Sequence, residues 1–396
     1  MDSIKLIKTT LFVMVSMYTF SYYRITAVYQ PLASLKWISL LLMVVVLMLV
    51  LKNQTFLIEY KKINLNIAMS SFIIVLAMLS FFNSKSVFGS VATLIILLIS
   101  YLFIILLYST SLELITINKI FYFGIITIVL ISMLLSLKEY SLFMNVFTDS
   151  ERFRISGLFK HPNNLAGNCF LGIILLFETI TLSNKKKRYF YINFFFILIL
   201  FFNIIISNSR TGLICLIIFF VNYFYLKRIK RKRIFLQAYI VGIIYIIGVM
   251  FLIKLFLTTN LNDRTNSLSV RMTGWKEVFL HMVNDPAVLI FGNGLSSTSG
   301  YVSGNLQQIG AATDNSYIII FYQLGIIGII MVVALILSLL VKNFYTNINR
   351  DIRMFSFNSS LILSFLIYCL FENYLLAMGN LMTLYFWLRM YRIAKS

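Results

Sequence analysis

Charged residues are scarce in this sequence and make up only 12% of its 396 positions. A soluble globular domain carries about 25% charged residues, so this chain lacks the polar groups needed to cover a surface in water. Hydrophobic residues account for 60%, and the mean hydropathy is +0.91. The shortage of charge excludes a soluble enzyme, a disordered protein and a secreted disulfide scaffold. It predicts a protein that uses lipid as solvent for most of its length.

Cysteine is also scarce, and its three copies, Cys169, Cys215 and Cys369, lie in apolar runs. They show neither metal-ligand nor disulfide spacing. No Asp-x-Asp pair is present that would hold a divalent ion for a nucleotide-sugar reaction, so we expect no metal and no cofactor. The net charge of +21 resembles a nucleic-acid signal, but basic residues beside membrane spans explain it more simply. No nucleic-acid partner is therefore expected.

Long hydrophobic runs fill most of the chain. A helix needs about 20 mainly apolar residues to cross the hydrocarbon core, whereas membrane β-strands would give shorter, alternating segments, which are absent. The predicted fold class is therefore all-α: a polytopic integral membrane protein with about twelve transmembrane helices in a single domain, residues 1–396. The predicted spans are 9–28, 33–51, 64–83, 87–109, 118–137, 163–182, 189–206, 211–226, 235–257, 315–341, 355–373 and 375–391.

Basic residues predict the orientation of these spans. With a cytoplasmic N-terminus, most of the 34 Lys and Arg residues fall on the cytoplasmic side, including the clusters at 185–188 and 227–233. The positive-inside rule therefore favours a multi-pass plan with both termini cytoplasmic. A plan with ten or eleven spans would put the two clusters on opposite sides. Two long loops then face outward, at about 138–162 and, between the ninth and tenth helices, at 258–314.

Several arginines lie on the outer side, where the orientation rule does not require them. They are Arg154, Arg210 in a short turn between two apolar helices, and Arg264 and Arg271 in the second long loop. A guanidinium matches phosphate oxygens, so their convergence would suit an anionic ligand such as a lipid-linked pyrophosphate. The alternative is that each arginine pairs with lipid headgroups or with a local acid, namely Glu151, Asp263, Glu277 or Asp285.

The outer loop 258–314 contains one predicted helix. Residues 270–283 place apolar side chains at helical spacing, and Asn284, Asp285 and Pro286 stop the pattern. This helix lies on the membrane surface or forms a lid over a lipid-facing cavity, and the two interpretations are compatible. The triplet Gly292-Asn293-Gly294 that follows is a weak phosphate-loop signal. The apolar face consists of Met272, Trp275, Val278 and Phe279.

Candidates for acid–base chemistry are few. Asp314 stands where the outer loop enters the tenth span, and Glu372 stands at the outer end of the eleventh. The two histidines, His161 and His281, are both on the outer side. A carboxylate at a helix entrance is often only an N-cap, and His161, before Pro162, is equally open to interpretation as a cap of the next helix.

Four blocks of sequence resemble the O-antigen ligase/polymerase superfamily, whose ligases and Wzy-type polymerases act on undecaprenyl-pyrophosphate-linked glycans. The blocks follow the order of the family and cover about residues 150–375. They are Arg154-Ile-Ser-Gly-Leu-Phe-Lys160-His161-Pro-Asn163-Asn-Leu-Ala, then Ser207-Asn-Ser-Arg210-Thr-Gly, then Arg271 with Trp275, Pro286 and Gly292-x-Gly294, and finally Asp314-Asn315 followed by Gly325-Ile-Ile-Gly.

The resemblance implies a GT-C-like glycosyltransferase bundle in a bacterial cell membrane. It implies transfer of a glycan from undecaprenyl pyrophosphate, with a lipid-linked donor and acceptor, membrane lipids and possible control by a chain-length regulator as partners. Arg210 and Arg271 would bind the pyrophosphate, supported by Arg154 and Arg264. Asp314 is the first candidate for the catalytic base and His161 the second. Further supporting contacts are expected from Lys160, Asn163, Trp275 and Asn315.

One departure from the family pattern bears on the reaction. Ligases of this family carry a histidine, taken as catalytic there, where this chain has Asp314. The difference favours a polymerase of O-antigen, capsule or exopolysaccharide repeats over a ligase. A ligase for another acceptor stays open. So do a lipid-linked oligosaccharide flippase and a cell-wall glycosyltransferase, although the spans are nearly free of mid-membrane charge and show no matching halves, unlike many transporters.

Overall fold

The computed structural model describes the chain in separate ranges, and every regular element in them is a helix rather than a strand. The protein is an all-α polytopic membrane protein, as its composition predicts. The helices form two compact units, and each unit is described by itself. The described residues are 3–20, 29–52, 74, 78, 87–109, 114–140, 154–159, 161–182, 187–228, 267–295, 314–348, 351–376 and 380–395.

Eight apolar helices coincide with predicted spans. Five of them are long and apolar enough to cross a membrane, and three are shorter. The predicted span 235–257 lies outside the described residues, and of the span 64–83 only residues 74 and 78 are described. The five long segments are Val87–Ile105, Ile115–Leu135, Pro162–Thr181, Arg210–Arg228 and Ser316–Asn347, and the shorter ones are Trp37–Val50, Phe190–Ile206 and Ile352–Tyr368.

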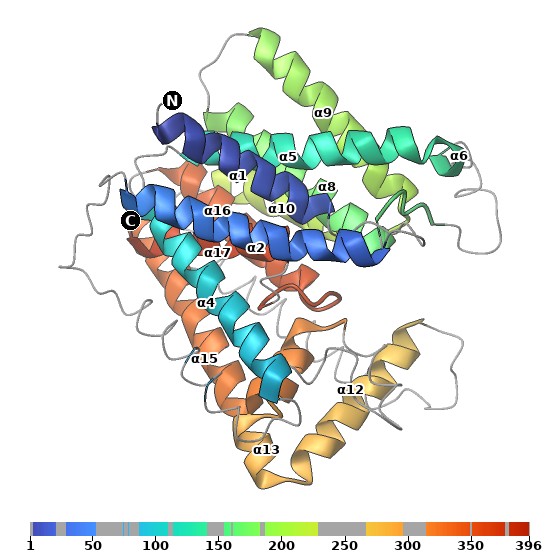
Figure 1. Ribbon diagram of the computed structural model, residues 1–396, viewed down its shortest axis with the longest axis vertical. Coiled ribbons are helices and arrows are strands. Elements are labelled where there is room, and N and C mark those ends of the chain that lie inside the picture. The colour runs from blue at the N-terminus through green and yellow to red at the C-terminus, as the bar shows by residue number, and fades with distance from the viewer. Residues whose placement is uncertain are drawn as a thin grey trace. The chain divides into compact units, whose positions relative to one another are not determined.

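The first unit is arranged around α8. Helix α1 packs beside α2 and α5, α5 lies against α8, and α8 lies against α9 (Figure 1). Helices α4, α10 and α17 contribute residues to both units. The bounds are α1 Ser3–Phe20, α2 Tyr29–Lys52, α4 Val87–Ser109, α5 Leu114–Leu135, α6 Leu137–Tyr140, α8 Pro162–Leu182, α9 Lys187–Ile206, α10 Arg210–Arg228 and α17 Leu381–Lys395.

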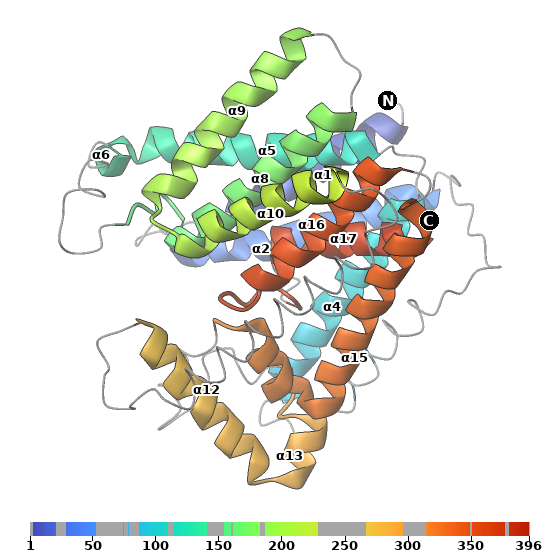
Figure 2. The same cartoon turned by 180° about the vertical axis from the view of Figure 1, so that it is seen from behind.

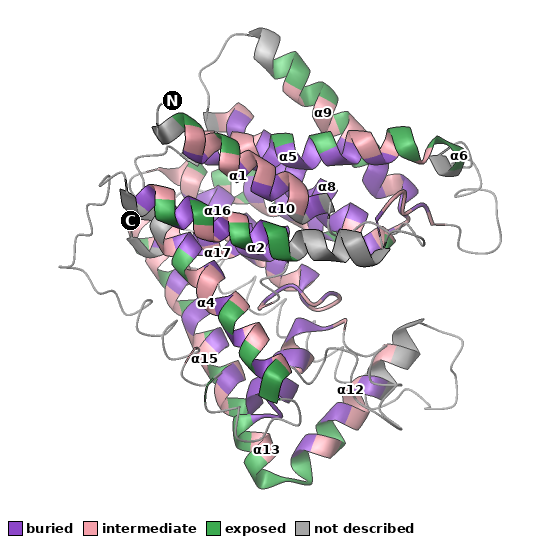
Figure 3. Ribbon diagram, viewed as in Figure 1, coloured by how far each residue is buried: buried purple, intermediate pink, exposed green. Residues whose placement is uncertain are grey.

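Helix α8 is central because it is buried over most of its length and carries a small residue where its neighbours approach. A side chain at Gly172 would bring its Cβ within 2.8 Å of Leu200 on α9 and 3.3 Å of Ile125 on α5. Small residues of this kind let membrane helices pack closely. In Figure 3, α8 is largely buried, whereas α9 turns a row of exposed residues outward. These exposed side chains include Phe190, Tyr191, Phe194, Phe195 and Leu198.

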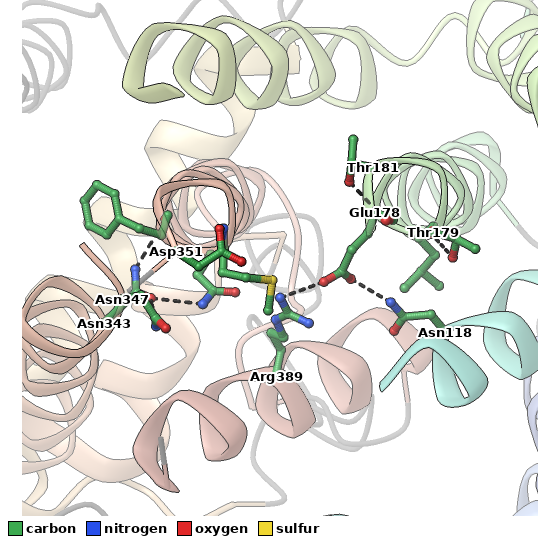
Figure 4. A network of polar contacts seen from close by, with 12 residues as sticks. Asn118, Glu178, Thr179, Thr181, Asn343, Asn347, Asp351 and Arg389 are labelled. Carbon is green, nitrogen blue, oxygen red and sulfur yellow. Dashed lines mark hydrogen bonds and ion pairs between the residues drawn. The ribbon is translucent and has the colours of Figure 1, made fainter. Parts of the chain in front are cut away.

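A buried polar network joins three helices of this unit (Figure 4). Glu178 of α8 and Arg389 of α17 form an ion pair with 2.7 Å between Oε1 and Nη2, and both side chains are 1% exposed. Asn118 of α5 donates its amide to Glu178 Oε2 at 2.7 Å. The Tyr385 hydroxyl lies 2.9 Å from Asn118 Oδ1 and 3.3 Å from Glu178 Oε2. A paired charge with satisfied neighbours can be tolerated among membrane helices.

The second unit contains the predicted amphipathic helix. That helix, α12, ends where the Asn-Asp-Pro stop signal predicts, and Asp285 then caps the N-terminus of α13, with Pro286 as the first helical residue. The buried face of α12 packs Val278 and Met282 on α15, and α13 also lies against α15 (Figure 2). The bounds are α12 Ser267–Val283, α13 Pro286–Phe291, α15 Ser316–Asn347 and α16 Ile352–Tyr368.

Helix α15 is broken at Gly325, whose φ of 66° is left-handed. A side chain there would place Cβ 2.2 Å from the Ile290 carbonyl oxygen. The backbone amides of Asn293 and Gly294 donate to the carbonyls of Tyr322 (2.8 Å) and Gln323 (3.1 Å), just before the break. Irregular backbone at membrane depth must be satisfied by protein in this way. Two amides of the Gly-Asn-Gly triplet are therefore engaged with the kinked helix α15, and the third, that of Gly292, donates to the carbonyl of Val288 in α13 at 2.8 Å.

Candidate active site

Arg271, from α12, pairs with Asp314, which lies just before α15. The distance between Arg271 Nη2 and Asp314 Oδ2 is 2.9 Å, and the side chains are 20% and 46% exposed, respectively. Arg271 Nη1 also donates to the carbonyl oxygen of Phe371 at 3.2 Å. Both sequence candidates therefore meet at one place in the second unit. Asp314 was not among the acids near the arginines in sequence that we considered as alternative partners. Its pairing with Arg271 was therefore not predicted.

Asp314 is not the N-cap of α15, so the interpretation of this residue as only a helix cap is wrong. The cap is its neighbour Asn315, whose side-chain oxygen accepts from the amides of Tyr317 (2.9 Å) and Ile318 (3.2 Å). Asn315 is buried, whereas the Asp314 carboxylate is half-exposed. Because a neighbour performs the capping, the carboxylate of Asp314 stays available to Arg271 and to a ligand.

Arg154 connects the first two sequence blocks in the first unit. Its Nε donates to the carbonyl of Ser207 at 3.3 Å, and its Nη2 donates to the side-chain oxygen of Asn163. The backbone amide of Ile155 donates to the carbonyl of Ile206 at 3.1 Å. The short segment 154–159 is thereby fixed against the turn between α9 and α10. Arg154 thus joins the segment 154–159 to the turn at Ser207 and, through Asn163, to the start of α8. These three parts are called the rim below.

His161 caps the start of α8, as the alternative interpretation predicts. Its exposed ring accepts a hydrogen bond at Nδ1 from the amide of Asn163, at 3.2 Å. The ring and Arg154 therefore both contact Asn163, through different atoms. His161 is held beside the rim formed by the first two blocks, where a capping role and a chemical role are compatible.

Arg210 is the first residue of α10, and its side chain is exposed. Ser209 precedes it and receives a hydrogen bond at Oγ from the amide of Gly212, at 3.4 Å. Asn208 adopts a left-handed φ of 49°, which asparagine tolerates better than most residues. Among the described residues, no side chain or carbonyl is hydrogen-bonded or ion-paired to Arg210. Its guanidinium can therefore meet a ligand from outside the protein.

The other predicted site residues are distributed as follows. Trp275 is half-buried on α12. Lys160 and Arg264 lie outside the described residues, as do residues 258–266 and 296–313 of the predicted lid. Within the described part of the chain, no three His, Cys, Asp or Glu side chains are grouped to hold a metal ion.

Sequence reasoning missed several groups that hold these residues. The carbonyls of Ser207 and Phe371 carry no side-chain signal, so their roles toward the arginines depend on tertiary structure alone. The pairing of Glu178 with Arg389 was also missed, because the two residues are far apart in the chain. A glutamate inside an apolar span was the available clue to this network.

The comparison with protein families gives one match. Residues 195–333 match the family model described as O-antigen ligase, which is consistent with the predicted resemblance to the O-antigen ligase/polymerase superfamily. The matched segment contains Arg210, Arg271 and Asp314 and ends inside α15. No curated protein matches the sequence. The match supports a glycosyl-transferring enzyme that ligates or polymerises surface polysaccharide at a membrane from lipid-linked oligosaccharide.

Proposed function

We propose that this chain, with its O-antigen ligase domain, polymerises a bacterial surface polysaccharide at the outer face of the cytoplasmic membrane. It would move a growing glycan from undecaprenyl pyrophosphate onto a hydroxyl group of another lipid-linked repeat unit. The observation that carries the proposal is the partly exposed pair of Arg271 and Asp314 within the matched segment. A cation for the leaving group and a carboxylate for the acceptor proton are adjacent there.

The reaction exchanges one bond to the anomeric carbon for another. The bond between this carbon and the pyrophosphate oxygen breaks, and its electron pair leaves with the undecaprenyl pyrophosphate. The acceptor oxygen forms the new glycosidic bond and loses its proton to a base. Pyrophosphate is a good leaving group, so the protein must supply charge stabilisation, positioning of two large substrates and the base. Neither a metal nor another cofactor enters this scheme.

We assign the pyrophosphate to Arg210 and Arg271 and the acceptor proton to Asp314. Arg210 is exposed without a described partner, and Arg271 offers a planar fork of donors. An ion-paired carboxylate is an acceptor with two oxygens, and only Oδ2 of Asp314 contacts Arg271. The other oxygen can receive the proton. His161 is the second candidate for the base.

The remaining predicted contacts have supporting roles in this proposal. Arg154 and Asn163 fix the turn from which Arg210 projects. Asn315 caps α15 beside the base. Arg264, Lys160 and Trp275 would contact the pyrophosphate or the sugars. Membrane lipids surround the apolar helices, and a chain-length regulator is expected as a separate partner.

A ligase is the second candidate, because the matching family model is described as O-antigen ligase. The two activities differ in the final acceptor. A polymerase leaves long labelled glycan on the polyprenyl lipid, whereas a ligase moves it to another molecule. A flippase is distinguished by the side of the membrane on which single repeat units accumulate. Loss of a flippase leaves them on the cytoplasmic side, whereas loss of a polymerase leaves them on the outer side.

The proposed function is tested by replacing the two pyrophosphate arginines in cells. Arg210→Ala and Arg271→Ala should each remove long-chain polymer from a gel while single repeats accumulate at the outer face. Lysine at either position should restore little, because it lacks the bidentate fork. The matched control is Arg353→Ala, an exposed arginine in the first turn of α16. A normal polymer ladder in both alanine variants, at normal protein level by immunoblot, would remove the proposed roles.

A further inference from the structure

Ser316, the first residue of α15, is completely buried and uses its whole hydrogen-bonding capacity. Its hydroxyl donates to the carbonyl of Glu372 at 2.7 Å. It accepts from the amides of Tyr374 at 2.8 Å and Leu375 at 3.1 Å. A serine hydroxyl has one donor and two acceptor lone pairs, so every one of them is engaged with the same backbone turn.

These bonds fasten the start of α15 to the turn that follows α16 (Figure 2). The backbone amide of Ser316 adds a further bond, to the carbonyl of Cys369 at 2.9 Å. Buried backbone groups outside regular structure need hydrogen-bond partners, and here a single residue of α15 satisfies several of those in the turn after α16. The turn therefore has a fixed position relative to the residues around Ser316.

The two acceptors of Arg271 lie on opposite sides of this junction. The carbonyl of Phe371, which accepts from Nη1, belongs to the residue directly before Glu372. Asp314, which accepts from Nη2, comes shortly before Ser316 in the chain. The spacing of the two acceptors, and with it the direction of the guanidinium plane, thus depends on the junction that Ser316 makes. Ser316 itself carries no charge and makes no hydrogen bond to Arg271.

We propose that Ser316 is a positioning residue for Arg271: its hydroxyl sets the orientation of the guanidinium by holding the Phe371 carbonyl and the Asp314 carboxylate in register. The inference rests on the proposed function, in which Arg271 binds the pyrophosphate. A guanidinium that turns within the site can keep one of its bonds and lose the paired geometry on which bidentate recognition depends.

The first measurement compares Ser316→Ala with Ser364→Ala. Ser364 is also buried, but its hydroxyl bonds only carbonyls of its own helix, those of Ser360 and Leu361. The assay uses purified full-length protein and a lipid extract from cells that lack the gene, which contains the natural lipid-linked repeats. Ser316→Ala should slow polymer formation on the order of tenfold or more, and Ser364→Ala should not. Ser316→Thr, which keeps the hydroxyl, should restore most of the rate.

The second measurement separates positioning from a general loss of stability. In an Arg271→Lys background the bidentate geometry is already gone, so Ser316→Ala should have little additional effect on the residual rate. An equal fold-loss in both backgrounds would overturn the inference. So would a folded Ser316→Thr protein as slow as the alanine variant. If Ser316→Ala cannot be recovered folded, Ser316→Cys takes its place, because sulfur keeps the volume and weakens the hydrogen bonds.

Failure of this inference can be told apart from failure of the proposed function. If Arg271→Ala leaves polymer formation intact, the role of Arg271 is wrong and Ser316 has nothing to position. If Arg271→Ala abolishes polymer and Ser316→Ala matches the wild-type rate, only the role of Ser316 is refuted.

Discussion

The protein contains two arginine–carboxylate pairs of similar length in different surroundings. Arg389 and Glu178 meet at 2.7 Å with side chains 1% exposed, whereas Arg271 and Asp314 meet at 2.9 Å with side chains 20% and 46% exposed. The first pair is enclosed by α5, α8 and α17. The second joins α12 to the residue before α15 and opens toward the outside of its unit.

The difference in burial separates a structural pair from one that can exchange partners. Removing one member of a buried pair leaves an uncompensated charge and costs about 3–5 kcal/mol. An exposed pair typically contributes about 0–1 kcal/mol. The partly exposed pair of Arg271 and Asp314, called the open pair below, is therefore expected to add little to the stability of the second unit. Arg271 can instead share its donors with an incoming phosphate at small cost. The buried pair of Arg389 and Glu178, called the closed pair below, is therefore expected to hold helices together. The open pair is expected to bind the pyrophosphate and to accept the acceptor proton.

The largest expected effect is at the open carboxylate. Asp314→Asn should keep the protein folded and lower the rate of polymer formation about 10²–10⁴-fold, because general-base catalysis contributes factors of this size. Asp314→His should retain more activity than the asparagine variant, since imidazole can accept the proton. The rate is measured with purified protein and lipid-linked repeats. Asp285→Asn is the control, because asparagine caps α13 as well as aspartate does.

Wild-type activity in folded Asp314→Asn protein would show that the open pair holds no catalytic base. Activity lost equally in the Asp285→Asn control would point to a general sensitivity of the second unit to the loss of acidic side chains.

The next effect is at the closed pair and concerns stability. Glu178→Gln should lower the free energy of unfolding by about 3–5 kcal/mol, since Arg389 is left buried without a counter-charge. The double variant Glu178→Gln with Arg389→Met should recover part of this loss. Thermal unfolding in detergent measures both, and the surviving folded protein should polymerise at the wild-type rate. A folded but inactive Glu178→Gln protein would contradict the structural role of this pair.

A smaller effect is expected at the edge of the closed network. Tyr385→Phe removes the hydroxyl that contacts Asn118 and Glu178 and should cost about 1 kcal/mol of stability, the typical net contribution of one hydrogen bond. The same thermal assay detects it. A loss as large as that of Glu178→Gln would mean that the hydroxyl, and not the ion pair, holds the network.

The smallest expected effect is on the stability of the second unit when its open pair is removed. Asp314→Asn should shift the free energy of unfolding by no more than about 1 kcal/mol, because exposed ion pairs contribute little. A destabilisation comparable to that of Glu178→Gln would make the open pair structural too and would erase the contrast between the two.

The sequence predicted the helices well because a long apolar run forms a membrane helix whatever its neighbours are. It also identified Arg271 and Asp314, through a family resemblance in the blocks around them. It did not predict their pairing. Only acids near each arginine in sequence could be considered as partners, and Asp314 is 43 positions away. The short α13 was missed because six residues show too little periodicity.

The Glu178–Arg389 pair and the junction at Ser316 were beyond sequence reasoning for a related physical reason. Arg389 was explained by the orientation rule, and Glu178 stood alone in an apolar span, so nothing local linked them. A serine before an apolar helix is usually only a cap, whereas here Asn315 is the cap and Ser316 bonds another helix. Contacts between distant elements decide both cases.

The most direct test of the account is an exchange of charges within the open pair. In the double variant Arg271→Asp with Asp314→Arg the ion pair can re-form, but each group stands in the other's place. The account predicts a folded protein at normal level that makes no long-chain polymer, because the guanidinium no longer faces the pyrophosphate and the carboxylate no longer faces the acceptor. Polymer restored by the exchange would show that the pair is needed only as a salt bridge, and would contradict the roles assigned to both residues.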